Sequence, residues 1–311
     1  MSKKFVNNSH IEGALYQHDL TLKVTGENSK NPGTEFISGN IQIATDDEQL
    51  NIVPVHFTYV TAVTSKGTSN ATYNVLKNII DGVYKTVMTD GADKATLLRV
   101  DSAIGLNDFY DRDDNLVSAK RNEGGFVHVT SSLIDNENAR NTFECDIVIT
   151  NVHRIEADEE KGTEEKAVVK GAIFNFRKEL LPVEFSVVNS KAMDYFEDLG
   201  ASSTNPVFTK IKGRQIATSV VRRVEEESAF GEPSIREYKS TKKDFIITWA
   251  MADPYVWDDE STITAQEMKE AMANREIFLA ELKKRRDEYK ASQGQTNTGA
   301  AAAPAAGGFD F

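Results

Sequence analysis

This chain has a single cysteine and lacks long apolar runs, and each absence excludes a class of protein. Cys145 stands alone among 311 residues, which excludes an intramolecular disulfide and a structural zinc site built from several thiolates. No apolar stretch approaches the ~20 residues that a membrane-spanning helix needs. Residues 1–8 lack an apolar stretch of signal-peptide length. We therefore expect a cytoplasmic protein that remains in the compartment where it is made.

The sequence also lacks the motifs of the common enzyme classes. It contains no Gly-x-x-x-x-Gly-Lys-Ser/Thr phosphate loop, no His-Glu-x-x-His zinc motif and no Gly-x-Ser-x-Gly nucleophile turn. The aspartate-rich residues 108–115 have the composition of a calcium loop but neither the EF-hand spacing nor its central glycine. The histidines are scattered without the spacing of metal ligands. We expect no enzyme, metal site or cofactor; the alternative is a metal-dependent enzyme centred on residues 108–114.

An excess of positive charge is absent as well. The formal net charge is −12, which argues against a polyanion binder whose whole surface is basic. Acidic residues gather in segments such as 156–160 and 225–227, so a local positive groove remains compatible with this charge. The length and the 40% apolar composition suit a globular protein of two domains.

An internal repeat organises the chain. In each copy a glycine opens an alternating segment, a polar turn follows, and Pro-Val-x-Phe begins a second alternating segment, which predicts a β-hairpin. The segments are 39–43 and 50–60 in the first copy, and 171–176 and 180–188 in the second. Pro54 and Pro182 suit strand starts, where a missing N–H matters least.

The similarity continues in the same order after each hairpin. Both copies contain a predicted helix that ends at glycine, residues 70–82 and 190–200. Two further strands are expected at 125–131 and 146–150 in the first copy and at 213–219 and 244–248 in the second. The opening strands are expected at 20–24 and 152–155, and the first copy carries a longer middle at 86–123.

Three strands, a helix and two strands form the element order of the OB-fold. We therefore predict a mainly β protein with two tandem OB-fold-like five-stranded barrels, residues 1–145, with an insertion at about 86–123, and residues 146–260. A period of roughly 90 to 130 residues is too long for a solenoid. The competing architecture is a duplicated β-sandwich of the kind found in viral structural proteins.

A C-terminal helix is predicted at residues 264–290. Residues 264–267, Thr-Ala-Gln-Glu, have the form of a capping box. Met268, Ala271, Met272, Arg275, Phe278, Leu279 and Leu282 share one face, and residues 283–286 place cations in the closing turns. We expect this helix to pack on the second barrel; contact with a neighbouring subunit or with DNA is the alternative.

The last residues, 291–311, are predicted to be a disordered tail. Residues 291–308 carry no charge and no large side chain, and such a tether spans roughly 23 to 26 Å. It ends in Phe309, Asp310 and Phe311, a tip whose rings suit an apolar pocket and whose carboxylates suit a basic rim on a partner. A frayed end that contains phenylalanine is the alternative.

This tail resembles that of bacterial and phage single-stranded DNA-binding proteins. These proteins end in a Gly/Pro/Ala-rich linker and a short acidic tip with a terminal phenylalanine, although the tip here has only Asp310 and the terminal carboxylate as acids. The resemblance implies a protein that coats single-stranded DNA without sequence specificity during replication, recombination or repair, in a bacterial cell or a phage-infected host. It also implies that the tip recruits a polymerase, helicase, primase or nuclease.

Aromatic and basic residues interleave along the predicted strands, a pattern that suits single strands. Rings stack bases without reading sequence while lysine and arginine track phosphates, so affinity should fall steeply with salt. The candidates are Phe57, Tyr59, Lys120, Arg121, Phe126 and His128 in the first copy, and Phe174, Phe176, Arg177, Lys178, Lys210, Lys212, Arg214, Arg222 and Arg223 in the second.

Strand alternation limits these candidates. Phe57 and Tyr59 are two residues apart, as are Phe174 and Phe176, so each pair is expected to point wholly inward or wholly outward. Trp249, Tyr255 and Trp257 are expected to cover the end of the second barrel. The alternative function is a phage virion or tail component built from duplicated β domains, which would self-assemble and ignore DNA.

Overall fold

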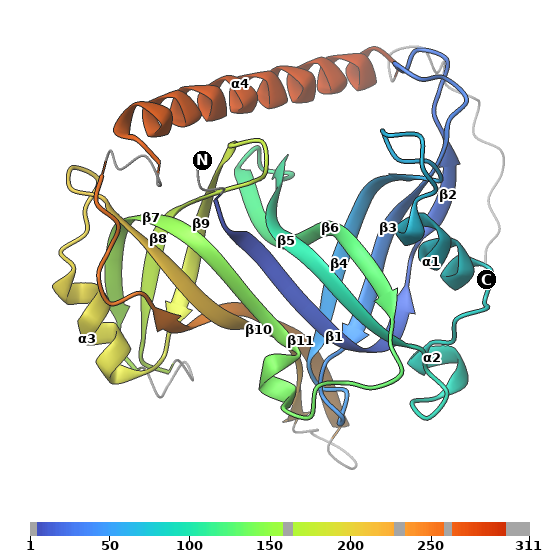
Figure 1. The fold of residues 1–311 in the computed structure, drawn as a ribbon, viewed down its shortest axis with the longest axis horizontal. Helices are drawn as coiled ribbons and strands as arrows, with labels where there is room; N and C mark the ends of the chain where they lie inside the picture. The colour runs from blue at the N-terminus through green and yellow to red at the C-terminus, as the bar shows by residue number, and fades with distance from the viewer. Residues whose placement is uncertain (1–4, 158–163, 227–233, 258–262, 297–311) are drawn as a thin grey trace, which may run out of the picture.

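The strands of this protein form one continuous sheet. The computed structural model describes residues 5–157, 164–226, 234–257 and 263–296, with only the backbone at 219–226, 234–242 and 293–296. Within these ranges eleven strands pair in the order β10-β11-β9-β8-β7-β1-β5-β6-β4-β3-β2. Two additional pairings, β10 with β7 and β1 with β3, close this sheet into two rings of five strands each (Figure 1).

The first ring contains β1, β3, β4, β5 and β6. Its strands are antiparallel except for a short parallel contact between β4 and β6. Helix α1 lies between β4 and β5 in the chain, followed by the short α2. The elements are β1 Asn7–His18, β2 Thr21–Val24, β3 Glu35–Ala44, β4 Ile52–Thr61, α1 Ala71–Ile80, α2 Val87–Asp90, β5 Leu97–Tyr110 and β6 Leu116–Val129.

The second ring repeats the same connectivity with β7, β8, β9, β10 and β11. Its one parallel contact joins β9 to β11, and α3 lies between β9 and β10. The elements are the 3₁₀ turn Glu137–Ala139, β7 Asn141–Ile155, β8 Lys166–Phe174, β9 Leu180–Val187, α3 Ser190–Asp198, β10 Val207–Glu226 and β11 Ser234–Ala250. In both rings the first strand pairs with the second and fourth, and the third pairs in parallel with the fifth, which confirms the predicted tandem OB-fold architecture.

The strands that close the first ring differ from those predicted. Its first strand is β1, whereas the predicted strand at 20–24 is β2, an exposed addition at the sheet edge. Strand β1 escaped detection because its buried positions include the polar residues Asn7 and Ser9 beside Ile11 and Leu15, so no apolar alternation marks it in the sequence. The predicted insertion at 86–123 is largely the β5–β6 hairpin, which supplies the fourth and fifth strands. Residues 146–150 belong to β7, so the expected boundary after residue 145 falls inside a strand.

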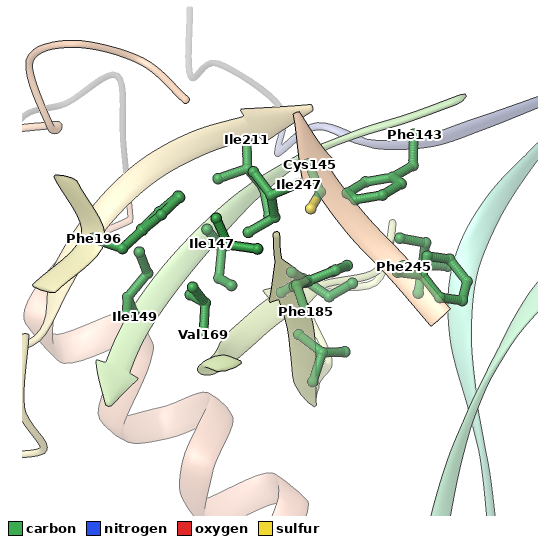
Figure 2. Close-up of a cluster of buried hydrophobic side chains, with 14 of the residues drawn as sticks. Phe143, Cys145, Ile147, Ile149, Val169, Phe185, Phe196, Ile211, Phe245 and Ile247 are labelled. Atoms are coloured by element: carbon green, nitrogen blue, oxygen red, sulfur yellow. The ribbon is translucent and has the colours of Figure 1, made fainter. Parts of the chain in front are cut away.

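Each ring encloses an apolar core, and each core takes side chains from the other ring's strands. The second core contains Phe143, Phe185 and Phe245 around the buried Cys145, with Phe143 and Phe185 stacked at 5.1 Å between ring centroids (Figure 2). Ile104 and Leu106 of β5 reach into this second core, and Ala217 of β10 lies in the first. The two rings are therefore packed as one unit.

The helices that cover the rings begin at asparagine caps. Asn70 Oδ1 accepts a hydrogen bond from Thr72 N at 3.1 Å at the start of α1, and Asn189 Oδ1 accepts from Ala192 N at 3.2 Å at the start of α3. Helix α1 buries Leu76 among other residues in the first core, and α3 buries Phe196 in the second. The two helices thus lie at equivalent places in the repeat.

Helix α4, Ala265–Thr296, crosses one end of both rings (Figure 1). The predicted capping box is present, since Glu267 N donates to Thr264 Oγ1 at 3.1 Å and Thr264 N donates to Glu267 Oε2 at 3.0 Å. The helix continues past its predicted end at residue 290 to Thr296, so the first residues of the segment predicted to be disordered are helical. The predicted tip at Phe309, Asp310 and Phe311 lies outside the described residues. No helix in the described ranges is long and apolar enough to span a membrane.

Buried amide side chains join the two rings where the cores meet. Asn122 Nδ2 of β6 donates to Gln215 Oε1 of β10 at 2.7 Å, and Gln215 Nε2 donates back to Asn122 Oδ1 at 3.0 Å. Asn7 of β1 donates to the carbonyl oxygens of Ile104 and Phe174, one from each ring. A buried amide left without its partner keeps the full cost of desolvation, so these pairs fix the two rings in one arrangement.

The amide pair predicts coupled effects of substitution. Asn122→Leu and Gln215→Met should each lower the free energy of unfolding by about 1–3 kcal/mol, because each leaves the buried oxygen of the remaining amide without its donor. The double variant should lose less than the sum of the two, as measured by urea unfolding followed by tryptophan fluorescence. Asn74→Ala, on the exposed face of α1, is the control and should change little. Strict additivity would show that the amides do not act as a pair.

Candidate functional site

A groove of about 1640 Å³ runs along the junction of the two rings. Its floor is formed by residues 7–10 of β1, 101–103 of β5 and 142–144 of β7. One wall consists of residues 57–60 and 123–126 from the first ring. The other consists of residues 176–177, 212–213 and 248–249 from the second. The groove therefore depends on the pairing of both rings.

Four exposed aromatic side chains line the groove, two from each ring. The exposed fractions are 47% for Tyr59, 70% for Phe126, 89% for Phe176 and 47% for Trp249. Exposed aromatics gathered in one concave surface are uncommon on soluble proteins and mark binding sites. The stability of the fold does not explain their exposure, because neither apolar core contains any of these rings.

Irregularities in the strands turn these rings outward. Ile37 pairs with Val60 and Gly39 with Phe57, so β4 has an extra residue at this point and the alternation from Phe57 to Tyr59 is broken. In β11, likewise, Trp249 pairs with Lys212 whereas Ile247 pairs with Gly213. The prediction that Phe57 and Tyr59 share an orientation is therefore wrong.

A third bulge places Phe126 in the groove. Asp101 pairs with Phe126 and Ala103 with Glu123, so β6 contains an additional residue at Gly124 and Gly125. Gly125 has φ +118°, and a Cβ atom there would lie 1.9 Å from the carbonyl oxygen of Asp101. Only glycine fits this position, which fixes the direction of the next side chain.

Phe174 and Phe176 also point in different directions, but not because of a bulge. Strand β8 ends at Phe174, whose ring is buried and stacks on Phe5 at 4.8 Å between centroids. Phe176 follows in the turn to β9, where alternation no longer applies, and it points into solvent. The expected common orientation of this pair is wrong, and Phe57 and Phe174 belong to the interior.

Charges of both signs accompany the rings. The guanidinium carbon of Arg177 lies 5.2 Å from the Phe176 ring centre, and Lys212 Nζ lies 5.2 Å from that of Trp249. Lys212 also approaches Glu144 Oε2 at 3.4 Å. Asp101 and Glu123 add further carboxylates to the lining. The groove thus combines aromatic surface with three carboxylates and two cations.

The other predicted basic candidates whose side chains the structure describes lie outside the groove lining. Arg121 pairs with Glu123 at 2.6 Å, Lys178 with Glu267 at 2.8 Å and Lys210 with Glu144 at 3.3 Å. Arg214 donates to Asn138, and His128 is exposed on β6. The side chains of Arg222 and Arg223 are outside the described part of the structure.

The sequence did not indicate Trp249 as a site residue. Tyr255 and Trp257 pack on Phe208 at the end of the second ring, at 4.8 and 5.8 Å between centroids, as expected of all three residues. Trp249 instead leaves that cluster because of the bulge in β11. The feature of the sequence that comes nearest to indicating this bulge is Gly213, which lies on β10 at the register shift. A Cβ atom at this position would lie 2.1 Å from the carbonyl oxygen of Ile246.

A second surface, lined by lysines, lies on the outer face of β8 and β9. Its cavity of about 580 Å³ is lined by Lys120, Lys166, Lys170 and Lys243 together with Glu184 and Asp244. Lys170 Nζ lies 2.8 Å from Glu184 Oε1, and Lys166 Nζ lies 3.5 Å from Asp244 Oδ2. Carboxylates therefore already pair with two of the four lysines.

Lys120 joins the first ring to this surface. From β6 its ammonium group reaches the edge of the second core, 4.8 Å from the Phe185 ring centre and 4.9 Å from that of Phe245, and donates to the carbonyl oxygen of Glu184. Burial lowers the pKa of Lys120 to about 8, against the opposing influence of Asp244 and Glu184. Lys120, which the sequence offered as a contact for DNA phosphates, therefore packs between the two rings.

Lys120 predicts a pH dependence of stability. Its folded pKa near 8 lies below the value of about 10.4 in an unfolded chain, so the unfolded state binds more protons between the two values and stability rises with pH. From about pH 7.5 to about pH 9.5, wild-type unfolding free energy should increase relative to that of Lys120→Met in urea titrations. Lys170→Met, at a more exposed lysine, is the control. Parallel pH profiles for wild type and Lys120→Met would contradict the assignment.

Comparisons with known proteins identify a family. Among solved structures, a deletion and point variant of the single-stranded DNA-binding protein from Thermus aquaticus is similar, with a TM-score of 0.45 and 10% sequence identity; the alignment covers 82% of this chain and 97% of that one. No curated protein matches the sequence. The model of the YorF family matches residues 5–285, which is most of the chain. The chain therefore belongs to the YorF family.

Proposed function

We propose that this protein binds single-stranded DNA in the groove between its two rings, without sequence specificity and without catalysis or a cofactor. The observation that carries the proposal is the set of four exposed rings, Tyr59, Phe126, Phe176 and Trp249, along one concave surface. Every base presents a π-face, and stacking on an aromatic side chain contributes about 1–3 kcal/mol per base. A duplex keeps its bases stacked within the helix, so the groove favours unpaired strands.

The charge of the groove makes stacking the main source of affinity. Among the side chains that the structure describes, Arg177 and Lys212 are the arginine and lysine of its lining, beside the carboxylates of Asp101, Glu123 and Glu144. With one phosphate on each cation, the slope of log K against log salt is about −1.4, from about −0.7 per phosphate for a single strand. We therefore propose a shallow salt dependence in place of the steep one expected from the sequence.

The groove aromatics predict which substitutions weaken binding. Phe126→Ala and Trp249→Ala should each reduce affinity for labelled oligo-dT by about 5- to 150-fold, since each removes one stacking ring. The measurement is fluorescence anisotropy at several salt concentrations, with a duplex of equal length beside the single strand. Tight duplex binding, or no binding to oligo-dT at low salt, would overturn the proposal.

A matched control is available on the same sheet. Phe109 of β5 is 41% exposed and lies outside the groove lining, so Phe109→Ala should leave oligo-dT affinity unchanged. An equal loss of affinity in Phe109→Ala would show that exposed aromatics act wherever they lie. The groove would then not be the binding site.

The C-terminal tip is proposed to serve a separate role. Phe309, Asp310 and Phe311 have the composition of a peptide that docks a replication or repair protein, with rings for an apolar pocket and carboxylates for a basic rim. Because the groove lies within residues 7–249, a chain ending at residue 296 should retain oligo-dT affinity. The anisotropy titration of this truncated chain beside the full chain separates the two roles.

A further inference from the structure

Helix α4 is fixed to the second ring by apolar contacts near its start. Ala271 is buried against Phe174, Leu180 and Phe208, and Met268 packs on the same cluster. Lys178, in the turn after β8, adds an ion pair with Glu267 at 2.8 Å. This end of the helix belongs to the packed body of the protein.

Farther along, α4 is held to the first ring by ion pairs. Arg275 Nη1 donates to Asp108 Oδ2 at 2.7 Å and Nη2 to Asp108 Oδ1 at 2.5 Å, with only 11% and 6% of these side chains exposed. Arg286 Nη2 donates to the carbonyl oxygen of Asp111 at 3.0 Å, and Lys290 pairs with Asp114. The aspartates at the tip of the β5–β6 hairpin therefore bind the helix.

A cavity of about 440 Å³ lies beneath the helix between these two attachments. Its roof includes Asn274, Arg275 and Phe278 of α4, and its opposite side includes Leu106 and Leu181. Its volume falls in the range of pockets that enclose a small ligand, about 300–1,000 Å³. A cavity of this size can accept a base of an unpaired strand but is too small for a duplex.

This cavity adjoins the groove. Glu123 and Arg177 line both. Phe278 in the roof is 45% exposed, and the Arg275 guanidinium carbon lies 5.4 Å from its ring centre. The same pairing of an exposed ring with a cation occurs in the groove at Phe176 with Arg177 and at Trp249 with Lys212.

We infer that a single strand bound in the groove continues through the cavity beneath α4, with one base on Phe278, so that the helix encloses the strand. This inference rests on the proposed single-strand binding. The contacts of Arg275 with Asp108, and of Arg286 and Lys290 with the β5–β6 hairpin, must all open to admit a strand without free ends. Enclosure would slow dissociation from long DNA because an enclosed strand leaves only by sliding to an end or by separation of these contacts.

Covalent closure of the helix tests the inference. In Asp108→Cys/Arg275→Cys, a short bismaleimide would link the helix to β5 in place of the ion pair. Cys145 is fully buried and burial raises the pKa of its thiol, so the reagent should reach the introduced cysteines. Closure after binding to circular single-stranded DNA should make the complex resist high salt and excess competitor in a native gel. Closure before binding should prevent capture of the circle but allow binding to linear oligo-dT.

A second cross-link provides the control. Glu281 and Arg285 form an exposed ion pair at 3.6 Å within α4, so Glu281→Cys/Arg285→Cys can be linked without joining the helix to the first ring. Retention of the circle by this control, or equal capture of circles and linear strands by the closed protein, would overturn enclosure. Failure of the unlinked protein to bind either DNA would instead overturn the proposed function.

A single substitution gives an independent test that does not depend on the double variant folding. Phe278→Ala should weaken binding of an oligonucleotide long enough to fill both groove and cavity by about 5- to 150-fold. It should leave unchanged the affinity of a short one that fills the groove alone. Met272→Ala, on the same helix with 50% exposure and outside the cavity lining, is the control. Equal affinities of wild type and Phe278→Ala at every length would contradict the inference.

Discussion

The pairing of β7 with both β1 and β10 is the constraint on which the rest of the structure depends. The first residues of β7 form hydrogen-bonded ladders with β1 of the first ring on one side and with β10 of the second on the other. Linked domains ordinarily move relative to one another unless a large apolar interface prevents it. Here backbone pairing replaces a linker, and the amides of Asn122 and Gln215 lie across the same junction. The groove between the rings therefore has walls of fixed separation, although each wall belongs to a different copy of the repeat.

A fixed junction makes the exposed aromatics useful for binding. Rings held at set positions lose little conformational freedom when a ligand arrives, so more of the stacking energy appears as affinity. The bulges at Tyr59, Phe126 and Trp249 help to fix the directions of these three side chains, because each bulge lies within a pair of hydrogen-bonded strands. Gly125 shows how strictly the backbone sets one of these directions, since no other residue fits against the carbonyl oxygen of Asp101.

The sequence predicted those features that depend on neighbouring residues and missed those that depend on distant ones. Pro-Val-x-Phe hairpins, the helices after them and the capping box at Thr264 were predictable because each is encoded within a short segment. The strand that closes the first ring was not, because β1 is recognised only by its partners on both sides. The orientation of Tyr59 and Trp249 depends on a register shift against another strand, which strand alternation alone does not reveal. Repetition of the element order still gave the correct architecture.

Some of the chain's excess carboxylates lie at the junction of the two rings, where they pair with cations. Carboxylates already pair with cations near the groove, as Glu144 does with Lys212 and Asp108 does with Arg275. A nucleic acid phosphate that approaches either cation must exchange with a carboxylate, so the net electrostatic gain is small. Stacking does not require breaking an ion pair, because the four groove rings lie outside the cores and remain exposed. Under the proposed function, the same arrangement would disfavour duplex DNA, which offers phosphates but few exposed base faces, and favour strands whose bases are free to stack.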